Sequence, residues 1–560
     1  MTPNRRMNQT NKPESPADDA ETSPTEAPAP GEKPARSVGS RMGIAALILA
    51  ASIFLSRILG FLREAVIAYT HGASYATDAY YAAFTLPDLM SYLLAGGTLS
   101  VTFIPLFSSY ISRGEEEAGW RMFSTIASTM GVVVVAFVIA LEIFTPYLIP
   151  LVNPGFVNDP RQLELAIQMT RIVVPAQMAF YLGGLLQATL FVREVFWPAA
   201  LAPLVYNVCI ILGGLLLEPW LGIQGFAVGV VVGALLGPLL LPVWAARKEI
   251  KFKFRFDPFD KDFRTFVLLA LPLMVGVSLV TVDEWLLKYF GSLAPDGAIS
   301  WLNNSRKMML VLFAVIGQAA GQAALPFLTR LYHQGKETEM GAMLASSLQR
   351  VGFLSMLGSA GLIVIAEPII WLVFKRGAFT AADAAQTASL MVIFAAGLAA
   401  WAIQTLATRG FYARQDTITP MVIGTVVVLV SLPIYWWLYG AYGVLGLAAS
   451  TTIGITLNAL ATLGVYRVRV GALPLKPIAA GILRGALFGV ACGAAAWGAR
   501  HLLAPYLDFR LPVENIALLI AMGAAFFAVG ALMVALLNPP ELDAILGRLR
   551  RRFARGKTAP

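Results

Sequence analysis

The sequence contains few charged residues, few histidines and only two cysteines. Charged residues make up 13% of its 560 residues, whereas a soluble globular domain carries about 25%. Hydrophobic residues account for 57% of the chain, and the mean hydropathy is +0.69. These values exclude an ordinary water-soluble globule and indicate an all-α polytopic membrane protein.

The scarcity of cysteine and histidine limits the chemistry that the chain can support. Cys209 and Cys492 fall in apolar runs, so we expect small buried side chains and no disulfide framework. His71, His333 and His501 lie far apart without ligand-like spacing, so we expect no metal site. No catalytic constellation and no ATP-binding motif is recognisable, and we predict neither an enzyme nor a bound cofactor.

The net charge of +9 does not indicate a nucleic-acid partner, because the basic residues cluster in short loops and at the two tails. Residues 1–42 are rich in Pro, Ala, Glu and Ser, which predicts a disordered cytoplasmic tail. Residues 538–560 predict a basic cytoplasmic tail. No cleavable signal is evident, since the first apolar run is about 30 residues long.

Apolar runs of at least about 18 residues, the length needed to cross a bilayer core, predict fourteen transmembrane helices. Lys and Arg concentrate in alternate loops, so the positive-inside rule predicts that both termini are cytoplasmic. The expected helices are 43–71, 76–111, 121–150, 161–192, 197–217, 222–246, 263–290, 298–332, 339–366, 381–411, 416–438, 441–465, 479–504 and 513–537.

An internal repeat recurs at a spacing of about 221 residues. "FIPLFSSYISRGEEE" aligns with "ALPFLTRLYHQGKET", "VREVFWP" with "ARQDTITP", and "LGIQGFAVG" with "YGVLGLAAS". These matches predict two six-helix lobes related by a parallel repeat, plus two C-terminal helices, as in an alternating-access transporter. The predicted parts are an N-lobe (43–247), a basic cytoplasmic linker (248–262), a C-lobe (263–466) and the last two helices (467–537).

Ten charged residues nevertheless lie within four of the predicted helices. Each charge at the bilayer centre costs about 2.5 to 3.5 kcal/mol, so we expect these side chains to line a wet cavity or to pair internally. They are Arg57, Arg63, Glu64, Asp78, Asp88, Asp283, Glu284, Lys288, Arg306 and Lys307.

Three arginines are the candidate site for an anionic head group. A rise of about 1.5 Å per residue brings Arg57 and Arg306 to one depth, just above the midplane. Guanidinium groups from opposing lobes would grip a phosphate or pyrophosphate bidentately. Arg63 lies about 9 Å higher, and a kink at Gly60 would turn it toward the same cavity.

The acidic residues can be explained by structural ion pairs as well as by a functional role. Arg57 could pair with Asp88, and Glu64, Asp78 and Asp88 could form ion pairs or a periplasmic gate. We expect Lys307 to point away from Arg306 and to pair with an acidic neighbour.

Asp283 and Glu284 could bind a coupling cation. Adjacent carboxylates on a helix point to different sides, so at most one of them would be functional.

Three stretches resemble the MurJ/MviN family of lipid II flippases in the multidrug/oligosaccharidyl-lipid/polysaccharide exporter superfamily. They are "SRILGFLREAVIAYTHGASYATDAYYAAFTLPDLM", "FKRGAFTAADAAQTASLMV" and "TRGFYARQDTITP". The resemblance spans residues 43–537 and implies a V-shaped fourteen-helix protein of the bacterial inner membrane. It implies transfer of undecaprenyl-pyrophosphate-linked peptidoglycan precursor to the periplasmic leaflet, for cell-wall biogenesis and cell shape.

The resemblance also implies roles for particular residues and partners. The cavity arginines of the family match Arg57, Arg63 and Arg306, and its characteristic aspartate matches Asp78. The implied partners are lipid II, membrane lipids and the cell-wall synthesis machinery, and we expect a monomer. Direction would come from the membrane potential or from a coupling monovalent cation.

The chain departs from the family pattern at several positions. Asp88, Ser91 and Tyr92 stand where the family has an asparagine and a basic pair, and Met308 follows Lys307 where the family places an acidic residue. The eleventh helix, "MVIGTVVVLVSLPIYWWL", lacks carboxylates, which argues against the sodium site that the resemblance suggests.

Two other classes of function remain open at this point. An exporter of another lipid-linked oligosaccharide, or a cation-coupled drug antiporter, would keep the two-lobe design. A membrane enzyme or a cell-wall scaffold would need a catalytic constellation or a large soluble surface, and the sequence suggests neither.

Overall fold

The computed structural model describes residues 38–95, 102–275, 279–471 and 473–542, and every regular element in these ranges is a helix. Within them, nine helices are long and apolar enough to cross a membrane, or ten when one bent pair is counted as a span. The all-α polytopic prediction is confirmed, whereas the count of fourteen stays a prediction. Most of the two predicted tails lies outside the described residues.

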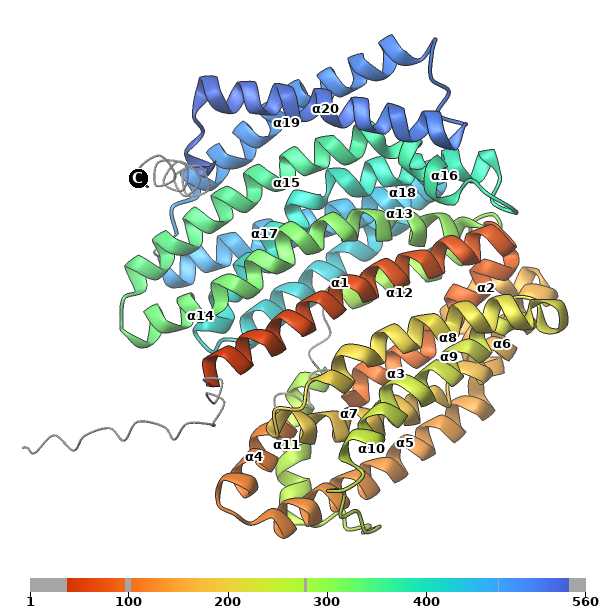
Figure 1. Cartoon of the computed structure of the whole chain (residues 1–560), viewed down its shortest axis with the longest axis vertical. Helices are drawn as coiled ribbons and strands as arrows, with labels where there is room; N and C mark the ends of the chain where they lie inside the picture. Colours follow the sequence, from red (N-terminus) through yellow and green to blue (C-terminus); the bar gives the residue numbers. More distant parts are fainter. Residues whose placement is uncertain (1–37, 96–101, 276–278, 472, 543–560) are drawn as a thin grey trace, which may run out of the picture. The chain divides into compact units, whose positions relative to one another are not determined.

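The chain divides into a unit of residues 1–47 and a unit of residues 48–560. The second unit contains nearly all of the described residues (Figure 1). Its N-terminal half contains residues 48–71 of α1 (Val38–His71), α2 (Tyr75–Ala83), α3 (Thr85–Ala95), α4 (Ile104–Ser112), α5 (Glu116–Val152), η2 (Pro154–Asn158), α6 (Pro160–Val173), α7 (Ala176–Val192), α8 (Trp197–Leu221), α9 (Gln224–Ala234), the π-helical η3 (Leu235–Leu240) and α10 (Leu241–Ala246).

The C-terminal half ends in two helices that pack on one another, with α19 also lying along α15 (Figure 1). Its elements are α11 (Lys261–Val275), α12 (Leu279–Ser292), α13 (Ala298–Phe313), the π-helical η4 (Ala314–Gln318), α14 (Ala319–His333), α15 (Glu337–Phe374), α16 (Ala381–Ala396), α17 (Leu398–Ala413), α18 (Ile418–Val470), α19 (Leu475–Leu503), α20 (Pro512–Leu537) and η5 (Pro540–Leu542).

Backbone geometry reproduces the sequence repeat. Left-handed φ values recur at three pairs of positions about 221 residues apart: Gly114 (75°) and Gly335 (69°), Glu194 (62°) and Gln415 (63°), and Gly222 (52°) and Gly443 (56°). Positive φ is uncommon for residues other than glycine, so its recurrence at a glutamate and the equivalent glutamine reflects a shared turn. The turn at Gly443 also interrupts α18 close to the predicted boundary between the eleventh and twelfth spans.

An ion pair repeats at the same spacing. Arg193 lies 2.5 Å from Glu116, and Arg414 lies 3.0 Å from Glu337. Each pair ties the residue just after a helix to the first turn of a long helix, α5 or α15. The repeat is therefore preserved in side-chain contacts as well as in turn geometry.

Helix α11 packs with the N-terminal half. Its Phe263 and Phe266 share a buried apolar cluster with Phe123 of α5 and Tyr181 of α7. Tyr110 of α4 also donates a hydrogen bond to Asp262 at 2.8 Å. The predicted lobe boundary at 262/263 stays a prediction, and these contacts join the start of the C-lobe to α4, α5 and α7.

Close backbone approaches join the halves at the end that the loop charges predict to be periplasmic. The amide of Ala378 donates to the carbonyl of Tyr69 at 2.8 Å, and the amide of Gly155 donates to Ser292 Oγ at 3.1 Å. A Cβ on Gly155 would lie 1.8 Å from the carbonyl oxygen of Ser292. Only glycine permits η2 and α12 to approach this closely.

Candidate functional site

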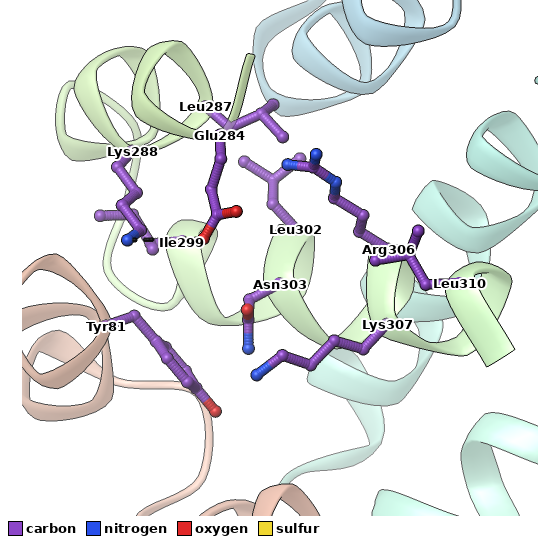
Figure 2. Close-up of a pocket in the computed structure, with 10 residues that line it drawn as sticks. All are labelled: Tyr81, Glu284, Leu287, Lys288, Ile299, Leu302, Asn303, Arg306, Lys307 and Leu310. Carbon is purple, nitrogen blue, oxygen red and sulfur yellow. Dashed lines mark ion pairs between the residues drawn. The ribbon is translucent and has the colours of Figure 1, made fainter. Parts of the chain in front are cut away.

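Two adjoining cavities lie between α1–α3 of the N-terminal half and α12–α13 of the C-terminal half, and we call them together the inter-half site. The first is about 80 Å³ and the second about 200 Å³. Tyr81, Glu284, Lys288, Asn303 and Lys307 line both of them. Figure 2 shows the first cavity, with Glu284 and Lys288 on α12 and Arg306 and Lys307 on α13.

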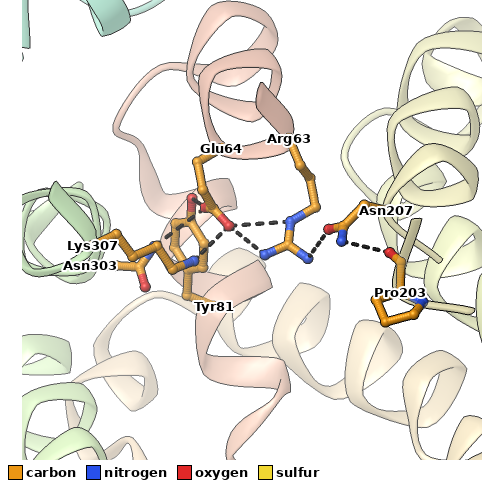
Figure 3. A network of polar contacts seen from close by, with 7 residues as sticks. All are labelled: Arg63, Glu64, Tyr81, Pro203, Asn207, Asn303 and Lys307. Atoms are coloured by element: carbon orange, nitrogen blue, oxygen red, sulfur yellow. Dashed lines mark hydrogen bonds and ion pairs between the residues drawn. The ribbon is translucent and has the colours of Figure 1, made fainter. Parts of the chain in front are cut away.

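Glu64 is the centre of the polar network at the second cavity (Figure 3). Its Oε1 lies 2.6 Å from both Arg63 Nη2 and Lys307 Nζ, and its Oε2 accepts a hydrogen bond from the Tyr81 hydroxyl at 2.7 Å. Arg63 Nη1 in turn donates to Asn207 Oδ1 at 3.1 Å. One carboxylate thus holds cations from opposite halves, and Lys307 has the acidic partner that the sequence led us to expect.

A second ion-pair group crosses between the halves at Lys288. Its Nζ lies 3.5 Å from Asp88 of α3 and 3.6 Å from Glu284, one turn earlier on α12. Among the described ion pairs, Asp88 therefore pairs with Lys288 rather than with Arg57. Lys288 was among the intramembrane charges of the sequence, but nothing in its local pattern identified Asp88 as its partner.

Arg306 lines the first cavity while remaining anchored in its own half. It is buried, and its Nη2 lies 3.4 Å from Asp283 Oδ2. Its guanidinium carbon lies 5.4 Å from the ring centre of Trp401, a distance typical of a cation–π contact. Asp283 also accepts a hydrogen bond from the hydroxyl of Tyr435.

Asp78 joins the halves as a helix cap. Its carboxylate accepts hydrogen bonds of 2.8 Å from the amides of Gly297 and Ser300, at the start of α13. Gly297 occupies the N-cap position with φ of 91° and has no side chain with which to cap the helix. The carboxylate on α2 replaces the missing cap and complements the helix dipole. A gate role for Asp78 stays a prediction.

Replacing Asp78 with alanine is expected to lower the melting temperature of the purified protein by several degrees. The substitution leaves buried amides of α13 unsatisfied, which costs about 1 to 3 kcal/mol for each such group. Asp78→Asn is the intermediate case, because its single side-chain oxygen can accept from only one of the two amides while its NH2 group faces the other, so it should lose less stability than Asp78→Ala but should not match the wild type. An equal loss in both variants would contradict the capping role.

Arg57 lies apart from the inter-half site. Its side chain is exposed, and its Nη2 donates to Gln318 Oε1 of η4 at 2.8 Å. It belongs to the lining of neither cavity, whereas Arg306 lines the first and Arg63 the second. The joint grip of Arg57 and Arg306 on one anion stays a prediction.

The candidate cation-coupling carboxylates are both engaged by basic side chains. Asp283 pairs with Arg306, and Glu284 pairs with Lys288. Within the part of the chain that the structure describes, no cluster of three or more His, Cys, Asp or Glu residues could hold a metal ion. Tyr435 was missed in the sequence, because 152 residues separate it from Asp283.

These features define the class of the protein. A helical, membrane-spanning chain built from a repeat, with a charged cavity between its halves, is a polytopic membrane transporter. The family model described as "Lipid II flippase MurJ" matches residues 67–532. The chain belongs to this family, and the prediction from its signature stretches is confirmed.

Similar proteins agree with this assignment. The "Probable lipid II flippase MurJ" of Rhizobium meliloti (strain 1021) is 28% identical over 451 residues, which cover 77% of this chain and 84% of that protein. The solved structure "Lipid II flippase MurJ, inward closed conformation" covers 88% of this chain and all of that one, with a TM-score of 0.73 and 22% identity. An inward-facing multidrug resistance MATE family transporter of the MOP superfamily covers 76% of this chain and 98% of its own, with a TM-score of 0.61 and 15% identity.

Proposed function

We propose that this chain is a lipid II flippase of the bacterial inner membrane. It carries the undecaprenyl-pyrophosphate-linked peptidoglycan precursor from the cytoplasmic to the periplasmic leaflet by alternating access. Family membership supports the substrate and supports a transporter rather than an enzyme. The repeated architecture and the charged cavity between the halves support the alternating-access mechanism.

The observation that carries the mechanism is the position of Glu64 between two cations. Arg63 comes from the N-terminal half and Lys307 from the C-terminal half, and both contact the same carboxylate oxygen. A pyrophosphate that enters the adjoining cavity competes with Glu64 for these cations. Binding of the head group therefore weakens a contact between the halves, which couples occupancy to their rocking.

Arg57 would act earlier in the cycle. Its exposed side chain lies one to two helical turns before Arg63 on α1, toward the predicted cytoplasmic end. We assign it the first contact with the head group, before the anion reaches the inter-half site. This order explains how Arg57 can serve transport without lining either cavity.

Replacing Arg57 with alanine is expected to slow lipid II transfer about tenfold, as expected for loss of one charge-assisted contact. Gln318→Ala is the matched control, because it removes the observed hydrogen-bond partner and leaves the guanidinium in place. Transfer is measured in reconstituted vesicles as the initial rate at which lipid II becomes accessible to an impermeant probe. Equal slowing in both variants would show that Arg57 acts only through Gln318.

We assign the direction of transport to the membrane potential, with no bound cofactor. A potential that is positive outside favours outward movement of negative charge by about 2.3 kcal/mol per charge per 100 mV. Asp283 and Glu284 already have basic partners, so a coupling monovalent cation would have to displace Arg306 or Lys288. Vesicles with an imposed potential and no sodium should therefore support transfer, and strict dependence on a sodium gradient would reject this assignment.

The proposal also includes the orientation of the two termini, the oligomeric state and the partner that receives lipid II. Both termini face the cytoplasm, the protein acts as a monomer, and it delivers lipid II to the cell-wall synthesis machinery. The basic loops support this orientation. Impermeant labelling of single cysteines placed in the two tails tests the orientation, and labelling from the outside would reverse it.

Depletion of the protein in its native host tests the function directly. Lipid II should accumulate in the cytoplasmic leaflet and become inaccessible to a periplasmic probe within a few generations. Expression of the wild-type chain should restore access. Normal outward exposure after depletion would reject the flippase function, and transport of drugs without lipid II transfer would favour an antiporter.

A further inference from the structure

An extended basic and aromatic segment packs along α5. Residues 250–257 read "IKFKFRFD" and connect α10 to α11. Alternate backbone amides donate hydrogen bonds to side chains of α5: Lys253 to Ser124 at 3.1 Å, Arg255 to Ser128 at 3.0 Å, and Asp257 to Thr129 at 3.1 Å. This pattern holds the segment extended, so its side chains alternate between two directions.

The alternation separates charge from apolar surface. Lys251, Lys253 and Arg255 share one register, and Phe252 and Phe254 share the other. All five side chains are exposed, and 70% of Phe254 is accessible. Exposed phenylalanines beside lysines are typical of a surface that sits at the membrane interface.

Two cavities flank this segment, and they differ in character. The first, about 630 Å³, is lined by Lys251, Lys253, Arg255, Arg121 and Glu117, among others. It therefore has four basic residues and one acidic residue. The ion pairs there are long and exposed, with Lys251 lying 3.9 Å from Glu117. Such pairs contribute little, which leaves the cations available to an anionic ligand.

The second cavity, about 280 Å³, is apolar. It lies on the faces of α5 and α7 around Gly131, Val132 and Leu182, and it shares Phe252 and Phe254 with the first. A Cβ on Gly131 would meet no atom within 4 Å, so this glycine leaves open space. The side chain of Val132 is 41% exposed on the same face of α5.

We propose that these two cavities form a binding site for an anionic phospholipid of the cytoplasmic leaflet. The phosphate of the head group occupies the basic cavity, and an acyl chain occupies the apolar one. Shared Phe252 and Phe254 lie where the glycerol region of the lipid would sit. The site is built from α5, α7 and the segment between α10 and α11 and shares no lining residue with the inter-half site, and its leaflet depends on the proposed orientation.

Charge and shape together favour a lipid over other anions. A free phosphate would use the basic cavity and leave the apolar one empty, and a nucleic acid would gain nothing from an apolar groove along α5. A phospholipid can occupy both, because its charged head is joined to an apolar tail and the two cavities share Phe252 and Phe254. Its binding would also immobilise residues 250–257. These residues belong to the connection between α10 and α11, and therefore between the two halves.

Native mass spectrometry of the purified full-length protein in detergent tests this site. The protein is titrated with dioleoylphosphatidylglycerol, and dioleoylphosphatidylcholine is the neutral reference. We expect clear preference for phosphatidylglycerol in the wild type. The triple variant Lys251→Gln, Lys253→Gln, Arg255→Gln should lose about tenfold or more in affinity for phosphatidylglycerol, with little change for phosphatidylcholine.

Two further variants keep the test specific. Gly131→Leu places a side chain in the apolar cavity, at a position where the Cβ meets no atom within 4 Å, and should weaken phosphatidylglycerol binding several-fold. Arg247→Gln, Lys248→Gln, Lys261→Gln removes the same number of charges at positions that flank residues 250–257 and line neither cavity, and it should bind normally. An equal loss in this control, no effect of Gly131→Leu, or full displacement by inorganic phosphate would overturn the proposal. Displacement by lipid II at equal concentration would identify a substrate entry site instead and would likewise overturn it.

Discussion

Replacement of Glu64 by glutamine is expected to reduce lipid II transfer about a hundredfold or more. The carboxylate is only 2% exposed and neutralises Arg63 and Lys307 together. Removing one partner of a buried ion pair costs about 3 to 5 kcal/mol. Because the Lys307 side chain is 35% exposed, we expect the lower end, about 3 kcal/mol, and this cost falls on the state in which the network joins the two halves. The population of that state would drop about a hundredfold, and a transport cycle that must pass through it would slow by the same factor. The measurement is the initial rate of transfer in reconstituted vesicles.

Lys307→Gln should be milder than Glu64→Gln. It leaves Glu64 paired with Arg63, so no buried charge loses its only partner. The double variant Glu64→Lys, Lys307→Glu again places one carboxylate between two cations and should recover transfer to within about tenfold of the wild type. Equal loss in the two single variants, without recovery in the double variant, would contradict a network centred on Glu64.

Elements with strong local signals were predictable from the sequence. The repeat was visible as matching segments, and the structure reproduces it in the paired turns at Glu194 and Gln415. A glutamate and a glutamine carry no propensity signal for positive φ, so the turn itself could be inferred only from the alignment of the two halves. The span count was harder, because broken helices such as α2 and α3, with 9 and 11 residues, are each too short to cross a membrane alone.

The candidate site was predictable as a set of residues but not as a set of pairs. The cost of charge in a bilayer identified Arg63, Glu64 and Lys307 as members of a shared polar region. Their pairing depends on side-chain direction and on contacts between segments 243 residues apart, which no local pattern encodes. Depth along a helix placed Arg57 and Arg306 at one level, yet Asp283 and Trp401 hold Arg306 inside its own half.

The halves are joined by contacts of two kinds with different consequences for transport. At the predicted periplasmic end, the Ala378 amide donates to the Tyr69 carbonyl, and the backbones of Gly155 and Ser292 lie too close for a side chain at residue 155. In the inter-half site, the contacts are ion pairs that an anion can replace, such as Lys288 with Asp88. In the proposed cycle, a pyrophosphate would act first on the exchangeable contacts, and opening outward would then require separation of the backbone contacts.

The second large effect is expected at Arg306. Arg306→Met leaves the carboxylate of Asp283 buried with only neutral partners such as Tyr435, which costs about 3 to 5 kcal/mol. The variant should lose both thermal stability and transfer. This single variant cannot distinguish a structural arginine from one that binds substrate.

The double variant Arg306→Met, Asp283→Asn separates the two roles. It removes both charges, and the asparagine oxygen still accepts the hydrogen bond from Tyr435, so the melting temperature should return to near that of the wild type. Transfer should stay at least about tenfold below the wild type, because the first cavity would lack the guanidinium to which we assign the contact with the pyrophosphate. Recovery of transfer together with stability would make Arg306 a structural residue only and would move anion binding to Arg63, Lys288 and Lys307.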